Sequence, residues 1–234
     1  MHLICYNIPI FLQVQDYCVF SRCFFKCCSA LVLVASLSFS TGIAAHPHSW
    51  IDMKTYVKGD DKQLTGFNMI WSFDPMTTAY LFDGEDMSPK HREATLKKLA
   101  ASVIENMMTT HYFTFFYDGK TPIRYEKVHK ATLTESKGKA TLEFELDLAK
   151  PYPYNGHPLQ LRIFDPTYYV DMSWKTKADV ILDADVQSHC TGKLKQPNPT
   201  PAQVSYALSI PPDADPDNTL GQLFTQTFYI TCKS

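Results

Sequence analysis

Residues 140–148 (ATLEFELDL) decide the fold class of this chain. Apolar residues stand at every second position of this stretch, and acidic residues stand between most of them. An extended strand would therefore turn its apolar residues to one face and its carboxylates to the other. Such a two-faced strand is typical of a sheet that packs one side against a core.

Working outward from this strand, turn signals separate other short β-prone segments. Upstream, we expect strands over 50–57 and 63–73, joined as a hairpin by a Gly-Asp-Asp turn at 59–61. Further strands are expected on both sides of 140–148, among them one at 111–117 directly after the helix and a last one at 180–182. Many short strands separated by turns predict an α+β, mainly β domain with an antiparallel, sandwich-like core.

One long helix is expected at about 89–109. Ser88 is its predicted N-cap, and Pro89 suits the first helical position. Apolar side chains recur here at steps of three and four residues and predict one buried face: Leu96, Leu99, Val103, Ile104 and Met107. Near 196–201 the chain has three prolines, which predict a linker.

The first 45 residues differ from the remainder of the chain. Arg22 and Lys26 precede an apolar run at 27–42, and small residues follow that run. This order is typical of a secretory signal peptide, so we expect a signal peptide at 1–45 and a single β-rich periplasmic domain at 46–234. The alternative is an N-terminal anchor that is not cleaved; after cleavage we expect no membrane span.

Cysteine usage supports an oxidising compartment. Beyond position 45 the sequence has two cysteines, Cys190 and Cys232. A pair of this kind in an exported chain predicts one disulfide. The alternative is that the two thiolates are ligands of a metal ion.

The sequence His46-Pro47-His48 directly follows the predicted cleavage site. Imidazole is the commonest protein ligand of late first-row metals, and side chains at i and i+2 point to one side of an extended chain. Pro47 has no N–H, so it blocks a site built on deprotonated backbone amides. We therefore expect metal chelation by His46 and His48, with Asp52 or a distant residue as a further ligand. The alternative is an exposed polar terminus.

Other classes of function lack support in the sequence. The formal net charge is −2, without the basic stripe that a nucleic-acid binder needs. Nucleophile-elbow, phosphate-loop and dinucleotide motifs are absent from the sequence, so we expect no enzyme. The one catalytic alternative is a copper oxidase that uses an N-terminal histidine brace. Asp74 and Asp165 stand in two Phe-Asp-Pro junctions, which predict turns rather than metal-binding carboxylates.

Several segments together resemble a known family. They are Ala-His-Pro-His at 45–48, Trp-Ser-Phe-Asp at 71–74, Tyr-Phe-Thr-Phe at 112–115, Phe-Asp-Pro-Thr-Tyr-Tyr-Val at 164–170, and the two late cysteines. The chain resembles proteobacterial proteins known as the periplasmic component of an ABC-type transport system, a family of unknown function. Such proteins are often encoded beside nickel/cobalt-type permeases. The resemblance covers most of residues 45–232 and implies no catalytic residues. Some relatives have a calcium-like acidic loop before the long helix, but the matching segment here, 82–87, is too short to form it.

Two functions follow as expectations. The resemblance implies a periplasmic accessory protein of divalent transition-metal transport, which binds nickel, cobalt, zinc or copper. Its partner would be an inner-membrane metal permease or an ABC transporter. The alternative is a metal-independent binding or interaction module, with a recognition surface made of four tyrosines, Tyr152, Tyr154, Tyr168 and Tyr169.

Overall fold

A computed structural model describes residues 47–211 and 214–233. The predicted signal peptide at 1–45 and the predicted ligand His46 lie outside these residues. All described residues belong to one compact unit. Within the described ranges, none of the helices has the length and apolar character that spanning a membrane requires.

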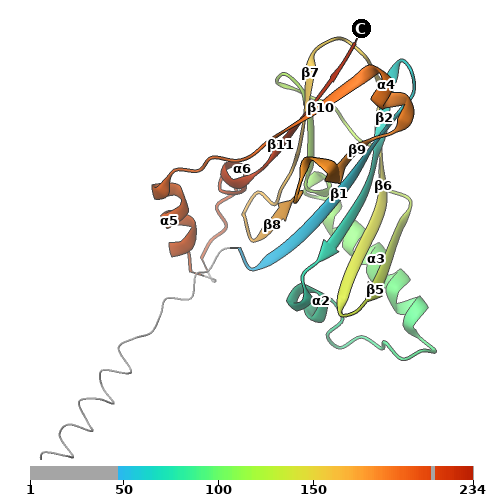
Figure 1. Cartoon of the computed structure of the whole chain (residues 1–234). Coiled ribbons are helices and arrows are strands. Elements are labelled where there is room, and N and C mark those ends of the chain that lie inside the picture. The colour runs from blue at the N-terminus through green and yellow to red at the C-terminus, as the bar shows by residue number, and fades with distance from the viewer. Residues whose placement is uncertain (1–46, 212–213, 234) are drawn as a thin grey trace, which may run out of the picture. The chain divides into compact units, whose positions relative to one another are not determined.

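The larger sheet, sheet A, has six strands in the part of the chain that the structure describes (Figure 1). They are β1 (Ser49–Gly59), β2 (Gln63–Phe73), β5 (Ala131–Ser136), β6 (Lys139–Pro153), β8 (Val170–Ser173) and β9 (Val180–Leu182). The order is β5-β6-β2-β1-β8, and β9 also pairs with β1. As predicted, β1 and β2 form an antiparallel hairpin.

Sheet A is nevertheless mixed, because β8 and β9 run parallel to β1. The prediction of a purely antiparallel core is therefore wrong at this edge. A tight hairpin turn forces two strands to be antiparallel, whereas a longer connection leaves either direction open. The chain reaches β8 from a strand of the other sheet, so no hairpin sets its direction.

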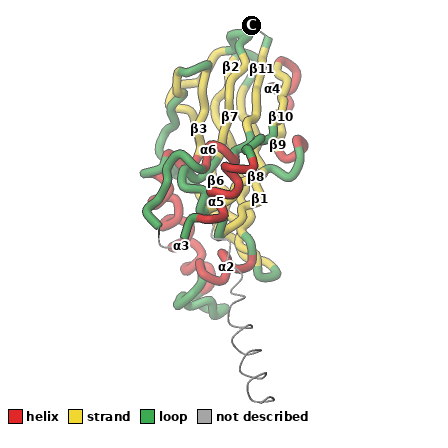
Figure 2. Tube along the Cα trace, turned by 90° about the vertical axis from the view of Figure 1, so that its left-hand side faces the viewer, coloured by secondary structure: helices red, strands yellow, loops and turns green. Residues whose placement is uncertain are grey.

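The smaller sheet, sheet B, has five strands among the described residues, in the order β10-β11-β7-β3-β4. They are β3 (Thr114–Asp118), β4 (Thr121–Pro122), β7 (Pro158–Ile163), β10 (Cys190–Lys195) and β11 (Thr227–Cys232). All neighbours in this sheet are antiparallel. Figure 2 shows the strands of both sheets running together, with α2 and α3 near their lower end.

The two sheets face each other across one hydrophobic core. Phe67 of β2 meets Phe116 of β3 edge to face, with ring centroids 5.1 Å apart. Along β6 the predicted alternation is confirmed: Leu142, Phe144 and Leu146 are fully buried, whereas the carboxylates between them lie on the outer side. Burying one face of each sheet against the other is the main stabilising term of such a sandwich.

The helices are α2 (Pro75–Leu81), α3 (Arg92–Met108), α4 (Ala184–His189), α5 (Pro201–Ser209) and α6 (Gly221–Phe224), with 3-10 turns η1 (His111–Phe113) and η2 (Lys177–Asp179). The prediction of one helix at about 89–109 is wrong at its start, because α3 begins at Arg92. The N-cap is His91 rather than Ser88, and it makes no side-chain capping bond; the Ser88 carbonyl accepts hydrogen bonds from the N–H groups of His91 and Arg92. Residues 88–91 therefore form a turn before the helix.

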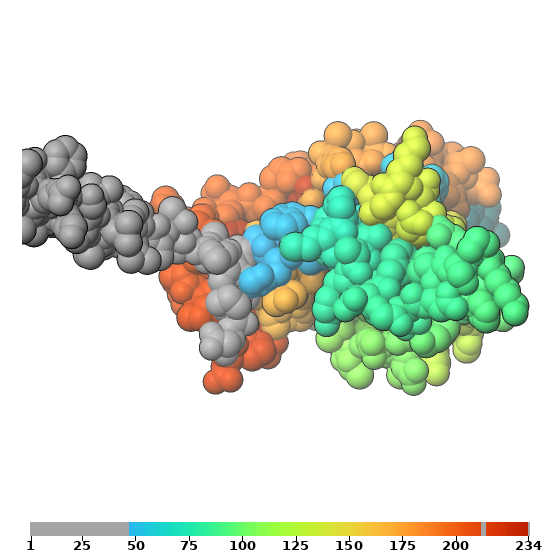
Figure 3. Space-filling model, turned by 90° about the horizontal axis from the view of Figure 1, so that it is seen from below, coloured from blue at the N-terminus to red at the C-terminus, as the bar shows by residue number. Residues whose placement is uncertain are grey.

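Helix α3 covers part of the inner face of sheet A. Its Val103 and Met107 line an apolar hollow of about 260 Å³ together with Ile51, Trp71 and Phe73 of sheet A. Seen from below, the segment from α2 through α3 covers this end of the domain (Figure 3). Sheet B and α3 thus together bury the inner face of sheet A.

Helix α5 was not expected from the sequence. Thr200 caps it, since its side chain accepts a hydrogen bond from the Gln203 N–H and the Gln203 side chain accepts one from the Thr200 N–H. Pro201 occupies the first turn, so the predicted linker at 196–201 ends one residue early. This reciprocal capping is a local signal that the sequence already contained.

Cys190 and Cys232 form a disulfide, so the prediction of a disulfide is confirmed and the alternative of two thiolate ligands is wrong. The two residues are direct partners in the pairing of β10 with β11. Both are almost fully buried. The bond therefore fixes the C-terminal strand to the edge strand of sheet B. A bond of this kind fits an oxidising compartment.

Candidate functional site

His48 is held by the loop that precedes β8. Its backbone N–H donates to the carbonyl of Tyr169 at 2.9 Å, and its ring stacks on the Tyr169 ring with centroids 4.6 Å apart. Its Nε2 atom is buried. The imidazole therefore helps to attach the start of β1 to the loop before β8. Its proposed partner His46 lies outside the described residues.

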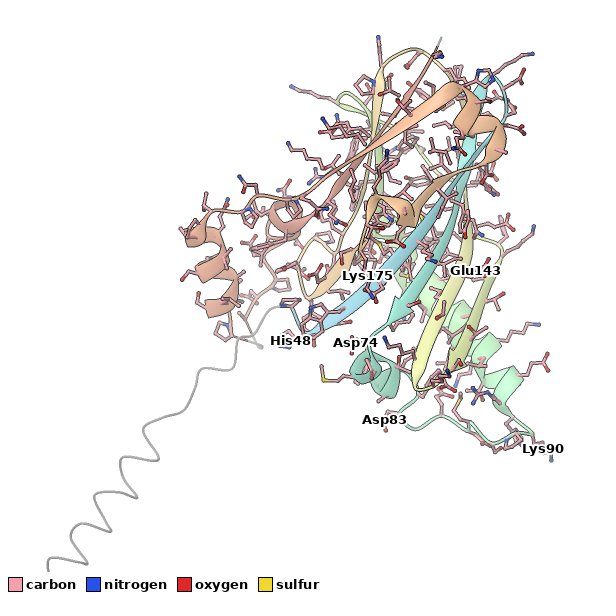
Figure 4. The ribbon with its side chains drawn as sticks, viewed as in Figure 1. His48, Asp74, Asp83, Lys90, Glu143 and Lys175 are labelled. Carbon is pink, nitrogen blue, oxygen red and sulfur yellow. A yellow bond between two sulfur atoms is a disulfide. The ribbon has the colours of Figure 1, made fainter. Side chains whose placement is uncertain are left out.

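Asp52 is not brought to His48. The two positions lie four residues apart along an extended chain, which separates them by about 13 Å. Metal ligands must lie within about 2 Å of the ion. Asp52 instead forms an ion pair with Lys175 at 2.6 Å, and this hydrogen bond raises the pKa of Lys175. Figure 4 shows His48 at the start of β1, well apart from Lys175.

The described ranges offer no alternative metal site. There, no three His, Cys, Asp or Glu side chains lie close enough to hold an ion together. The metal site predicted from the sequence thus depends on His46, which lies outside the described residues, and on further ligands that the described residues do not supply beside His48.

The carboxylate of Asp74 organises the turn after β2, as the turn interpretation predicts. It accepts hydrogen bonds from the N–H groups of Met76 and Thr77 and so caps α2. It also accepts the Trp50 N–H at 3.0 Å, which joins α2 to β1. Burial alone would raise the pKa of Asp74, but the hydrogen bonds outweigh burial and hold the pKa below its usual value.

Asp165 likewise organises the turn at the second Phe-Asp-Pro junction. Its buried carboxylate accepts hydrogen bonds from the N–H groups of Thr167 and Val170. The loop then packs on α6, where the Gly221 N–H donates to the Pro166 carbonyl at 2.8 Å. Both Phe-Asp-Pro carboxylates are therefore occupied by turn formation.

The four tyrosines of the expected recognition surface do not form one surface. Tyr152 and Tyr154 lie at the end of β6, where their hydroxyls donate to Asp118 and to the Asp60 carbonyl. Tyr168 and Tyr169 lie before β8, at the opposite end of β1. The eleven residues of β1 span roughly 33 Å. Two distant pairs therefore replace the predicted cluster.

A different site emerges beside β3. A cavity of about 520 Å³ lies between the end of α3, the turn η1, strand β3 and residues 122–127. We call it the aromatic cavity, because five rings line it: Tyr112, Phe115, Phe116, Tyr117 and Tyr125. Its volume lies within the range of small-molecule binding sites, roughly 300–1,000 Å³.

The turn η1 forms one wall of the aromatic cavity in an unusual conformation. His111, Tyr112 and Phe113 have φ values of 54°, 54° and 52°, in the left-handed region. This region costs a non-glycine residue about 1–2 kcal/mol. Two hydrogen bonds hold the turn: the Val128 N–H, sixteen positions away in the chain, donates to the Tyr112 hydroxyl, and the nearby Thr114 hydroxyl donates to the Tyr112 carbonyl. Strain of this kind is concentrated at functional sites.

The predicted strand at 111–117 is therefore wrong over its first three residues, which form η1. The sequence has no glycine in this segment to announce a left-handed turn. Only packing and the Tyr112 hydroxyl contact select the conformation, and these depend on residues distant in the chain.

Tyr125 projects a polar group that the described residues leave unsatisfied. Its ring packs against Phe67 at 6.3 Å, and its hydroxyl oxygen is buried without a hydrogen-bond partner among them. Burial raises the pKa of the Tyr125 phenol well above its usual value, so the group keeps its proton. An unpaired buried hydroxyl costs about 1–3 kcal/mol.

Charged side chains surround the mouth of the aromatic cavity. Arg124, Glu126 and Lys127 all line it and are exposed. Among the described residues, neither Arg124 nor Lys127 forms an ion pair, whereas Lys58 is neutralised by carboxylates of β6. The mouth therefore has a positive balance.

The fold and the cavity define a disulfide-stabilised β-sandwich domain with a cavity lined by aromatic residues. The chain belongs to the family described as "Protein of unknown function (DUF1007)", which its sequence matches over residues 31–232. It is similar to a Haemophilus influenzae protein named "Uncharacterized protein". The two are 33% identical over 205 residues, which cover 86% of this chain and 98% of that protein.

Proposed function

We propose that the protein is a metal-independent binding module that works in the periplasm as part of a transport system and holds a small ligand in the aromatic cavity. The observation that carries the proposal is the cavity of about 520 Å³ with five aromatic residues in its lining. The disulfide supports a location outside the reducing cytoplasm.

The shape of the site supports binding of a small molecule. Ligand sites are mostly apolar, with a few polar groups that fix orientation. The aromatic cavity has this composition: aromatic residues form much of its lining, and the charged side chains of Arg124, Glu126 and Lys127 supply polar contacts. A transporter or permease of the inner membrane would be the partner that receives the ligand.

Transition-metal handling is the rival proposal. It rests on His46 and His48, and the stacking of the His48 ring on Tyr169 gives it no support from geometry. Binding of nickel, cobalt, zinc or copper by the processed protein would favour it. The aromatic cavity makes no contribution to that function, so the two proposals are tested separately.

The test of the binding function uses N-phenyl-1-naphthylamine, a neutral dye that fluoresces in apolar sites. We expect saturable binding to one site, and we expect Met108→Trp to weaken it at least fivefold by filling the mouth of the cavity. Met108 is 41% exposed, so the larger ring can be accommodated without unfolding the domain. Leu208→Trp is the matched control, because Leu208 is 47% exposed on α5 and does not line the cavity.

Equal affinity of the parent protein and both tryptophan variants would place the dye elsewhere on the surface. The proposal of a ligand site in the aromatic cavity would then be withdrawn.

A further inference from the structure

An edge strand from each sheet borders one groove. Among the described residues, β10 pairs with β11 alone and β9 pairs with β1 alone. A groove of about 460 Å³ is lined by Ile181 and Leu182 of β9 and by Thr191 and Gly192 of β10, and we call it the edge groove. Figure 2 shows β9 and β10 at the same side of the domain. An open sheet edge offers backbone groups to which a further strand can bind.

The pairing of β10 with β11 fixes which backbone groups of β10 face away from β11. Antiparallel partners alternate between close pairs without hydrogen bonds, with Cα atoms about 4.5 Å apart, and wider pairs that exchange them. The Cα atoms of Cys190 and Cys232 are 3.9 Å apart, so these two residues form a close pair. One position earlier, the Lys233 N–H donates to the His189 carbonyl, as the alternation requires. Even-numbered residues of β10 therefore turn their N–H and C=O groups away from β11.

Gly192 and Leu194 are the even-numbered residues of β10 whose backbone groups stay open. The Cys190 N–H already donates to the Val186 carbonyl at the end of α4. In contrast, no hydrogen bond within the described ranges uses the N–H or C=O of Gly192 or Leu194. Two donors and two acceptors thus lie along the open side of β10, and the two residues are roughly 7 Å apart. An extended peptide binds to this pattern when it adds a strand to a sheet.

The side chains of β10 specify the chemistry of an added strand on its outer face. Leu194 packs against the hydrophobic core, whereas Lys193 and Lys195 are exposed. In the part of the chain that the structure describes, neither lysine forms an ion pair, and neither does Lys177, which lines the edge groove. Residues of opposite charge on neighbouring strands attract each other. Carboxylates are therefore the matching side chains opposite Lys193 and Lys195.

The other face of an added strand would meet apolar surface. Ile181 and Leu182 are only half-buried where they line the edge groove, so they keep apolar area that a partner can cover. Because side chains of a strand alternate between its two faces, the partner segment needs apolar residues between its acidic ones. A second copy of this chain is a poor occupant, since pairing β10 with another β10 would set lysines against lysines. Edge lysines oppose this kind of self-pairing.

We propose that the edge groove binds an extended segment of another protein, which adds as a strand to β10. The segment alternates apolar residues, which cover Ile181 and Leu182, with acidic residues, which lie opposite Lys193 and Lys195. The inference goes beyond the small-ligand function, because it concerns a different surface. β10 is at one edge of sheet B, whereas the aromatic cavity lies beside β3 and β4 at the other edge.

Two fluorescein-labelled peptides test the proposal on the purified processed protein. Both consist of four glutamates and three valines; the two residue types alternate in one peptide and form two blocks in the other. We expect fluorescence anisotropy to show at least tenfold tighter binding of the alternating peptide. Equal affinities would mean that net charge alone attracts the peptides. That result, or no binding of either peptide at millimolar concentration, would overturn the proposal.

Amide hydrogen exchange, measured by NMR, locates the bound strand. In the free protein we expect the N–H groups of Gly192 and Leu194 to exchange faster than the N–H of Lys193, which faces β11. The alternating peptide should slow exchange at Gly192 and Leu194 at least fivefold. It should leave β5, the edge strand of sheet A, unchanged. Protection at β5 without protection at β10 would place the peptide on the wrong edge and refute the assignment.

The role of charge is tested by the double variant Lys193→Glu, Lys195→Glu. We expect it to weaken binding of the alternating glutamate peptide at least tenfold and to favour a peptide in which lysine replaces glutamate. The control Lys139→Glu, Lys150→Glu makes the same change of charge on β6, which has a neighbouring strand on each side. An equal loss in both double variants would contradict the proposed pairing with β10.

The small-ligand site and the edge groove can fail independently. Met108→Trp, which fills the mouth of the aromatic cavity, should leave the affinity of the alternating peptide within twofold. Absence of dye binding would refute the small-ligand function and leave the edge groove in place. A peptide affinity that falls at least fivefold in Met108→Trp would place the peptide in the aromatic cavity and overturn the assignment to β10.

Discussion

Replacing Gly221 by alanine should disrupt the contact between α6 and the loop that contains Asp165. A Cβ atom at position 221 would lie 1.8 Å from the Asp165 carbonyl oxygen, so the two backbones must separate by about 1.6 Å to reach ordinary contact at 3.4 Å. That movement breaks the hydrogen bond from the Gly221 N–H to the Pro166 carbonyl. Losing this bond costs about 1 kcal/mol, and the overpacking costs roughly 1–3 kcal/mol.

We therefore expect Gly221→Ala to lower the free energy of unfolding by about 3 kcal/mol, which lowers the midpoint of thermal unfolding by about 6–12 °C in a domain of this size. Urea titration followed by circular dichroism and a thermal scan would measure both quantities. Helix propensity works in the opposite direction, because alanine favours a helix over glycine by about 1 kcal/mol. A loss of stability must therefore come from the close approach.

Gly84→Ala is the matched control. Gly84 has φ of +72°, and an added Cβ would meet nothing within 4 Å. Only the left-handed backbone penalises alanine there, at about 1 kcal/mol. If Gly221→Ala were no less stable than Gly84→Ala, the close packing of α6 against the Asp165 loop would not exist as described.

Three further predictions follow from the described residues. Cys190→Ser with Cys232→Ser should lower the free energy of unfolding by about 4 kcal/mol by the loop-entropy model, since the bond joins residues 42 apart; urea unfolding of the parent in reducing agent should match the variant, and an unchanged midpoint would contradict this. Under the metal proposal, calorimetry with nickel should show that His48→Ala loses binding and that Asp52→Asn keeps it, because about 13 Å separates the two positions; a loss in both variants would refute the separation. Burial raises the pKa of Asp171 above its unfolded value of 3.8, so this group contributes stability at low pH that is lost as pH rises through the folded pKa. Asp171→Asn should therefore resist urea better than the parent at pH 7, with the advantage vanishing below pH 3.8; an advantage that persists there would show a different cause.

Local patterns in the sequence predicted the elements whose structure is locally determined. The alternation at 140–148 predicted the buried and exposed faces of β6, and the turn at 59–61 predicted the β1–β2 hairpin. The two late cysteines predicted their bond because the compartment and the residue count leave few choices. In each case a few adjacent residues or a single pair carry the whole signal.

Features that depend on distant partners were not predictable in this way. The parallel pairing of β8 and β9 with β1 follows from how the chain crosses between sheets, which no window of residues encodes. Helix α5 is an exception, because its capping pair Thr200 and Gln203 is a local pattern that the sequence alone contains.

The candidate site shows the same division. The metal hypothesis drew on residues adjacent in sequence, and the structure engages two of them elsewhere: His48 with Tyr169 and Asp52 with Lys175. The aromatic cavity instead depends on the left-handed turn η1 and on the placement of residues 122–127 beside it. Neither is visible before the chain is folded, because both are defined by surroundings rather than by residue type.

The parallel partners of β1 also set the order in which the domain can assemble. β1 is the first described strand, yet the residue that pairs with Ser49 at its edge, Val170, follows about 120 positions later. Such distant pairings slow folding, because a long loop must close before the contact forms. A nascent chain therefore keeps this edge open until most of its length has been made. That delay prolongs the state in which a polypeptide can still be threaded through a narrow pore.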